Sequence, residues 1–246
     1  MIRIASRYCG PPDSGNGGYS AGLLAAQLSG AVEVTLRSPP PLETPLQVDT
    51  SPMAVRLLEG ERLVAEARPT LLELEVPEPP SFEHATELTR HYVGHRKHHF
   101  PTCFVCGPAR AVGDGLRIFP GSEQPGENVA APWTVDASLA DVSGVVGPEL
   151  VWAALDCVGY FAVGSPDYPV ALLGRMTAEV LATPQVGEPC VVLGWSEGRD
   201  GRKLNAGTAV FGADRRLLGR ARQTWIRLHS TFPPPPLSSR APPSVR

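Results

Sequence analysis

The sequence predicts an α+β protein built from two copies of one unit, an apolar helix followed by an antiparallel meander of strands. Two observations lead to this prediction. The apolar segments 18–29 and 148–163 are each followed by strand-like segments that end at glycine- or proline-rich turns. In addition, AVEVTLRSPPPLETPLQV in the first half resembles TAEVLATPQVGEPCVVL in the second, because in each a strand ends in prolines and another resumes after Glu-x-Pro or Glu-Pro. We therefore expect an internal repeat.

Composition and charge exclude several classes of protein. The chain has 246 residues, enough for one large domain or two small ones. Its 22 basic and 25 acidic residues give a net charge of −3, which argues for neither a nucleic-acid nor a membrane partner. The first residues, MIRIASRYCGPP, lack the pattern of a signal peptide, and no apolar run approaches the roughly 20 residues of a membrane span. We expect a cytoplasmic enzyme or binding protein whose five cysteines are thiols.

The first half, residues 1–75, is expected to form one repeat. In residues 1–8, apolar and polar side chains alternate as in a short strand. The glycine- and proline-rich loop 9–18 then leads into a helix that we expect to end near Gly30. The strands expected after this helix are 31–37, 44–50, 54–60 and 62–74.

Residues 76–102 form the predicted junction, a proline-containing linker with an exposed helix that ends in a histidine-rich run. The second repeat is expected over residues 103–230. Its predicted strands are 115–119, 128–135, 172–183, 189–197, 203–213 and 216–228. The tail 231–246 is rich in proline and serine with almost nothing to bury, and we expect it to be disordered.

The second helix contains a single interior charge, Asp156. Pro148 and Glu149 mark the start of this helix and Gly164 its end. The residues between are apolar nearly all round, which is typical of a helix wrapped by other structure. Burial tends to raise the pKa of a carboxyl group toward the range of a useful base. Asp156 is therefore a candidate catalytic residue, the alternative being a capped or salt-bridged carboxylate with a structural role.

Three sequence features resemble one enzyme family. CFVCGPARAVGDGLRIF, residues 103–119, resembles the Cys-x-x-Cys-Gly…Gly-Leu-Arg opening of thioesterases of the phenylacetate-pathway type. GNGGYSAGLLA, residues 15–25, is similar to the His-Gly-Gly helix start of hotdog thioesterases, with Asn16 where histidine often stands. Asp156 falls on the helix where several of these enzymes carry their catalytic acid. The resemblance implies a double hotdog, in which each of two helices is wrapped by a curved antiparallel sheet.

The resemblance also implies a composite active site, in which backbone amides at one helix N-terminus polarise the thioester carbonyl and the acid comes from the other helix. Eight residues before Asp156 stands Pro148, which has no N–H to donate. Eight residues after Gly17 stands Ala25, which is no acid. We therefore expect one competent site and one dead one. The candidate catalytic residues are Asp156, Asn16, Gly17 and Gly18.

The pair Cys103 and Cys106 raises the question of a metal site. Three histidines precede it, at positions 95, 98 and 99. A zinc ribbon normally adds a second CxxC or two histidines after the first pair, whereas Cys157 lies in an apolar helix and Cys190 in a strand pattern. Gly107-Pro108 argues against the helix that a redox CxxC requires. We expect reduced thiols in a turn and no metal.

Arg202, Arg220 and Arg222 belong to a basic cluster on neighbouring strands and turns. Such a cluster is either a solvated edge or a binding site for the phosphates of coenzyme A.

The GNGG loop, residues 15–18, is no dinucleotide fingerprint, because GxGxxG and a following βαβ unit are both missing.

The predicted function is that of an acyl-CoA thioesterase-like hydrolase. Asp156 acts as general base on water or as nucleophile, and Gly17 or Gly18 donates to the oxyanion. No cofactor is expected apart from coenzyme A as part of the substrate, an acyl-CoA or acyl-carrier thioester. The alternative is a non-catalytic acyl-CoA or acyl-ligand binding protein on a decayed hotdog fold. A hydratase is disfavoured because no Asp-x-x-x-x-His pair starts a helix, and a homo-oligomer is left open.

Overall fold

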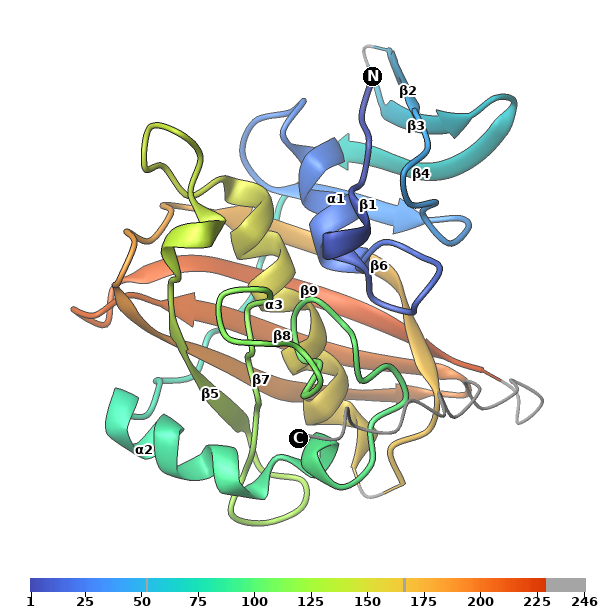
Figure 1. Ribbon diagram of the computed structural model, residues 1–246. Helices are drawn as coiled ribbons and strands as arrows, with labels where there is room; N and C mark the ends of the chain where they lie inside the picture. The colour runs from blue at the N-terminus through green and yellow to red at the C-terminus, as the bar shows by residue number, and fades with distance from the viewer. Residues whose placement is uncertain (52, 166, 229–246) are drawn as a thin grey trace, which may run out of the picture.

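The computed structural model describes residues 1–51, 53–165 and 167–228. Its strands are β1 (Val32–Leu36), β2 (Gln47–Thr50), β3 (Val55–Glu59), β4 (Arg62–Pro69), β5 (Val129–Thr134), β6 (Ala171–Val180), β7 (Pro189–Asp200), β8 (Lys203–Phe211) and β9 (Leu217–Arg227). They form one antiparallel sheet in the order β2-β3-β4-β1-β6-β9-β8-β7-β5 (Figure 1). The predicted α+β class with a large antiparallel sheet is confirmed.

The two halves of the sheet have the same strand order. From the centre outward the first half runs β1-β4-β3-β2 and the second β6-β9-β8-β7. The halves meet where β1 pairs with β6, with Val34 opposite Met176. β5 extends the outer edge of the second half, whereas in the first half the chain start makes only a bridge between Ile2 and Leu46. The strand expected over residues 1–8 is thus reduced to this bridge, followed by a 3₁₀ turn at Ser6–Tyr8.

The helices are α1 (Gly17–Ala25), α2 (Phe82–Leu88) and α3 (Pro148–Gly164). α1 packs on β1, β3, β4 and β6, and α3 packs on β5 to β9. α2 lies on the other face of the sheet, because Val191 and Leu193 pack in its cluster while Val192 packs with α3. α1 ends at Ala25 rather than near Gly30, because the N–H groups of Gln27 and Leu28 bond three residues back and tighten the chain into a turn.

The two long helices touch backbone to backbone. A Cβ atom at Gly18 would lie 2.5 Å from the Trp152 carbonyl oxygen, and one at Gly22 would lie 2.7 Å from Glu149 Cα. Only glycine, which lacks that atom, permits this approach. The contact brings the start of α1 against the middle of α3.

The segment 115–119 was expected to be a strand, and this prediction is wrong. Its backbone instead pairs with the cysteine loop, since Leu116 N–H donates to Phe104 O and Ile118 N–H to Val105 O. Arg117 adopts a φ of 53°, which interrupts an extended strand. The buried side chains of Leu116 and Ile118 on either side of Arg117 explain the strand-like alternation.

The remaining predicted strands are confirmed with shifted ends, and two of them stop early, at Pro69 and Val180. The predicted linker contains α2 and then two 3₁₀ turns. Within the described ranges, no helix has the length and apolar composition needed to cross a bilayer. The tail predicted to be disordered, 231–246, lies outside the described residues. The repeat boundaries at 75 and 103 stay a prediction.

Candidate active site

Asp156 lies in the middle of α3 and is 2% exposed. Its Oδ2 accepts two hydrogen bonds from the start of α1: the Asn16 side-chain amide donates at 2.7 Å and the Gly18 backbone N–H at 3.1 Å. The structure therefore brings together three of the four predicted catalytic residues, across the contact between the two helices.

Asn16 is oriented by its position as the N-cap of α1. Its Oδ1 accepts from the Tyr19 N–H at 2.9 Å, so that the amide NH₂ group turns toward Asp156. The Asn16 backbone is fixed as well, since its N–H donates to Tyr8 O and its carbonyl accepts from the Ser20 hydroxyl. The side chain that caps α1 thus also supports the carboxylate.

Burial raises the pKa of Asp156 to about 7, against the lowering effect of the hydrogen bonds from Gly18 and Asn16. Its second oxygen, Oδ1, is buried and makes no hydrogen bond within the described part of the chain. The carboxylate therefore has one oxygen anchored at the N-terminus of α1 and one without a hydrogen-bond partner among the described residues. The alternative of a capped carboxylate with a structural role is also supported, because Asp156 accepts the Gly18 N–H at the start of α1.

Gly17, the fourth predicted residue, is the first residue of α1. A Cβ atom there would lie 3.1 Å from Leu173 and 3.2 Å from Leu36, so the residue packs against apolar side chains. Its role as oxyanion donor stays a prediction.

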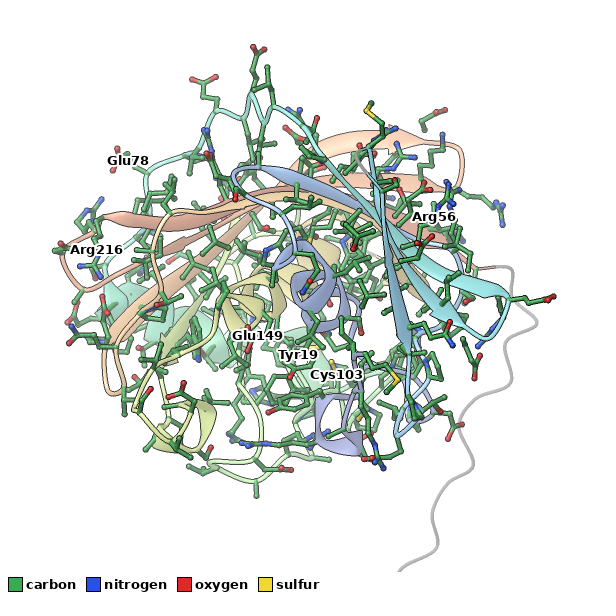
Figure 2. The ribbon with its side chains drawn as sticks, turned by 90° about the horizontal axis from the view of Figure 1, so that it is seen from above. Tyr19, Arg56, Glu78, Cys103, Glu149 and Arg216 are labelled. Carbon is green, nitrogen blue, oxygen red and sulfur yellow. The ribbon has the colours of Figure 1, made fainter. Side chains whose placement is uncertain are left out.

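The opposite end of the helix contact, near Pro148 and Ala25, is the place of the predicted dead site, and its lack of activity stays a prediction. Glu149 lies there, with its backbone against Gly22 and its carboxylate turned back over Gly147. Figure 2 shows Glu149, Tyr19 and Cys103 on the side of the sheet that holds α1 and α3. Glu149 differs from Asp156 in facing the start of its own helix.

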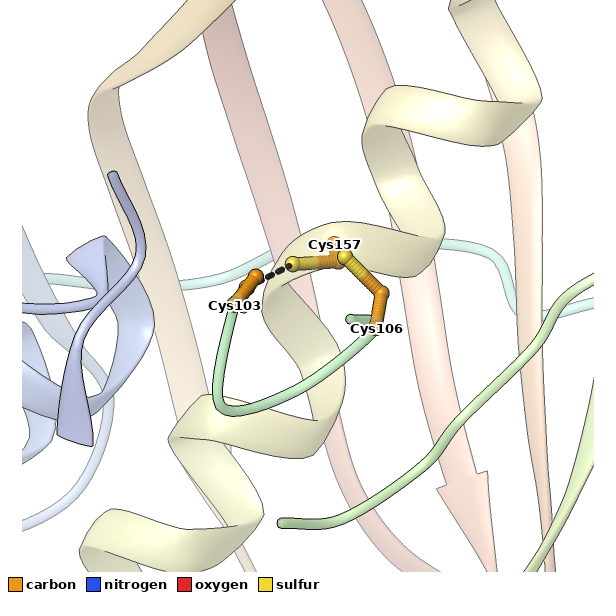
Figure 3. A group of neighbouring side chains, drawn as sticks. All are labelled: Cys103, Cys106 and Cys157. Atoms are coloured by element: carbon orange, nitrogen blue, oxygen red, sulfur yellow. Dashed lines mark hydrogen bonds between the residues drawn. The ribbon is translucent and has the colours of Figure 1, made fainter. Parts of the chain in front are cut away.

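A group of thiols borders the Asp156 site. Cys103 and Cys106 come from the loop before residue 115, and Cys157 follows Asp156 on α3 (Figure 3). Cys103 Sγ lies 3.7 Å from Cys157 Sγ, and the Asn16 amide nitrogen lies 4.0 and 3.9 Å from these two sulfur atoms. Hydrogen bonds from the Cys106 and Cys157 thiols hold the pKa of Cys103 below its usual range. All five cysteines are thiols, as expected.

The arginines assigned to coenzyme A lie elsewhere. Arg220 pairs with Glu179 at 3.0 Å and Arg222 with Glu197 at 2.7 Å. Both alternate along β9 with residues that contact α3, so they point to the opposite face of the sheet from Asp156. Arg202 lies in the turn between β7 and β8. The structure does not bring these residues to Asp156, and their role stays a prediction.

Two surface hollows lie away from the candidate site. One lies between α2 and the β5 edge, lined in part by His84, Leu88 and Leu193. The other lies beside Glu188 and Arg216. Neither is lined by Asp156, which is itself 2% exposed.

No family model matches the chain, and no curated protein matches it. Among solved structures, the chain is similar to the TesB protein of Mycobacterium avium subspecies paratuberculosis, with a TM-score of 0.60, 13% identity and 89% of each chain covered. It is also similar to a Thermobifida fusca protein assigned as a thioesterase II, with a TM-score of 0.58, 14% identity and coverage of 93% of this chain and 91% of that one. A Novosphingobium aromaticivorans protein assigned as a thioesterase is also similar, with a TM-score of 0.54, 10% identity and coverage of 93% of this chain and 94% of that one. The chain has the hotdog fold of these thioesterase structures.

Proposed function

We propose that the protein is a double-hotdog hydrolase that cleaves an acyl-CoA or acyl-carrier thioester at one composite site between α1 and α3. The observation that carries the proposal is the contact of the Asp156 carboxylate with the Asn16 amide and the Gly18 N–H. The equal strand order of the two halves supports the duplication, and the thioesterase structures with the same fold support the reaction class.

In the proposed reaction, Asp156 Oδ1 takes a proton from water while that water attacks the thioester carbonyl carbon. The negative charge that develops on the carbonyl oxygen is stabilised by N–H groups at the start of α1, where the helix dipole is positive. The thiolate then leaves as the carbonyl re-forms and takes up the proton from Asp156, which restores the carboxylate. Direct attack by Asp156, giving an acyl-enzyme anhydride that water hydrolyses, uses the same residues.

The Gly18 N–H has two roles in this scheme. Without substrate it donates to Asp156 Oδ2 at 3.1 Å. During the reaction it turns to the substrate oxygen, and the Gly17 N–H next to it is the second donor. The Asn16 amide keeps the carboxylate in place throughout.

Non-catalytic binding of an acyl ligand on the same fold is the second candidate function. The observation that favours it is the burial of Asp156, which is 2% exposed. In that case the Asp156 contact serves only to join α1 to α3.

A hydrolysis screen separates the two functions. Acyl-CoA esters of graded chain length are incubated with the protein, thiol release is followed, and ligand binding is measured on the same series. The proposed function predicts turnover of at least one ester by the parent protein. Binding without turnover across the series would establish the second function instead.

A further inference from the structure

Three thiols and one imidazole lie together in the fold without a part in the proposed hydrolysis. The sulfur atoms of Cys103, Cys106 and Cys157 lie within 4.8 Å of one another, and all three residues are buried (Figure 3). His98 Nε2 lies 3.3 Å from Cys106 Sγ. The sequence argument against a metal rested on the missing second ligand pair, and the fold supplies a third thiol from the helix α3.

The spacing of the sulfur atoms fits a shared metal ion. Two thiolates bound to one tetrahedral zinc at ~2.3 Å stand ~3.8 Å apart. Cys103 Sγ and Cys157 Sγ are 3.7 Å apart. Thiolate sulfur is a soft ligand, and a compact group of three such ligands favours zinc among the common divalent ions.

The loop that carries Cys103 and Cys106 turns tightly. The Gly107 N–H donates to the Cys103 carbonyl oxygen at 2.9 Å and closes the loop between the two cysteines. Gly107 allows the chain to turn so tightly, since a Cβ atom at this position would lie 2.5 Å from the carbonyl oxygens of Cys103 and Pro101.

His98 supports the cluster from outside. Its Nδ1 accepts the Phe100 N–H at 3.0 Å, which leaves the proton of the neutral ring on Nε2, facing Cys106 Sγ. Such an N–H contact to a ligating sulfur is the kind of outer contact that tunes a metal site.

From this geometry we propose that Cys103, Cys106 and Cys157 bind one zinc ion as thiolates, with His98 as an outer hydrogen-bond donor to Cys106. Each thiol that binds releases its proton to solvent, so the ion replaces three protons. The three thiolates leave one position of a tetrahedral ion for a further donor. The ion ties the cysteine loop to α3, directly beside Asn16 and Asp156. This proposal does not depend on the proposed hydrolysis.

The test is elemental analysis of the full chain, purified under reducing conditions and dialysed after loading with zinc. We expect about one zinc per chain in the parent protein, and loss of it in Cys157→Ser. The matched control is Cys190→Ser, which removes a buried thiol of β7 outside the cluster and should leave the zinc content unchanged. His98→Gln should weaken zinc binding by roughly 10- to 100-fold.

A second measurement covers the case in which Cys157→Ser does not fold. In the parent protein, removing zinc with a chelator should lower the melting temperature, because the ion ties the cysteine loop to α3. The proposal is overturned if the loaded parent holds no zinc after dialysis. Zinc bound equally well by a folded Cys157→Ser, or a Cys103–Cys157 disulfide in the reduced preparation, overturns it as well.

Discussion

The two long helices occupy corresponding places in the two halves, yet each has what the other lacks. α1 is nine residues long and begins with a capping Asn16 and two glycines, of which Gly18 donates its N–H to Asp156 on α3. α3 is seventeen residues long and begins at Gly147 and Pro148, with no side-chain cap. Only α3 has a buried acid in its middle, Asp156. The proposed site therefore needs both halves, because its N–H donors lie on α1 and its acid lies on α3.

The difference extends to the edges of the sheet. The second half is closed by the six-residue strand β5. At the same place in the first half, the chain start makes one bridge and is held by Glu43, which accepts from Arg3 and from the Ser6 N–H. The first half thus combines a short backbone pairing with side-chain hydrogen bonds where the second half uses a full strand.

Gly18→Ala is expected to have the largest effect on the fold, because it attacks the contact on which the composite site depends. The added Cβ would meet Asp156 Cβ and the Trp152 carbonyl oxygen at 2.5 Å each, and neither can move without displacing α3. We expect a loss of ~1–3 kcal/mol in the free energy of unfolding, measured by denaturant titration. Gly17→Ala is the control, since its Cβ would meet leucine side chains at 3.1 Å. Equal loss in both variants would show that the α1–α3 approach is not tight.

Asn16→Ala tests the side-chain cap that α1 has and α3 lacks. It removes the acceptor for the Tyr19 N–H and the donor to Asp156, at a cost of ~1–2 kcal/mol. Ser81→Ala is the matched control, because it removes the N-cap of α2 far from the carboxylate. If a thioester is turned over, Asn16→Ala should lower the rate and Ser81→Ala should leave it at the parent value. Equal rates in both would limit Asn16 to capping.

Glu149→Gln tests whether the other end of the helix contact is inactive. The carboxylate lies over Gly147 at the start of its own helix and has no amide partner on α1 within the described residues. We expect a change in unfolding free energy within ~0.5 kcal/mol and no change in turnover. Turnover that falls as far as in an Asp156 variant would mean that both ends contain a working site.

Glu43→Gln tests the edge of the first half through pH. Hydrogen bonds from the Ser6 N–H and hydroxyl and from Arg3 lower the pKa of this exposed carboxyl group. A lowered pKa gives stability that is present above the unfolded-state pKa of about 4.3 and is lost as pH falls through the folded-state pKa. The parent should therefore melt slightly higher than Glu43→Gln near pH 7, and the difference should vanish in acid. A difference that persists in acid would contradict the role of the charge.

Much of this fold was readable from local pattern. The helix at 148–163 and most strands follow from apolar periodicity, which burial on one or both faces imposes. The segment 115–119 has the same alternation for another reason: Leu116 and Ile118 are buried on either side of a residue with positive φ, a backbone detail without a sequence signal.

The candidate site was partly readable as well. An acid alone on an apolar helix marked Asp156 as a candidate, whereas its pairing with Asn16 and Gly18 was implied by the resemblance to hotdog thioesterases. The sequence did not predict that Cys157 joins Cys103 and Cys106, because Cys157 follows them by more than 50 positions. The same holds for Arg220, whose partner Glu179 is 41 positions away.

The central claim is that Asp156 is the reacting group of a composite site, and Asp156→Asn tests it most directly. The variant keeps the shape and an acceptor for the Gly18 N–H, and it removes the base or nucleophile. For any thioester that the parent hydrolyses, turnover should fall on the order of 10²-fold or more. The free energy of unfolding should stay level or rise, because a buried charge is relieved. An Asp156→Asn protein that hydrolyses every accepted thioester at the parent rate would contradict the account and leave the carboxylate as a joint between α1 and α3.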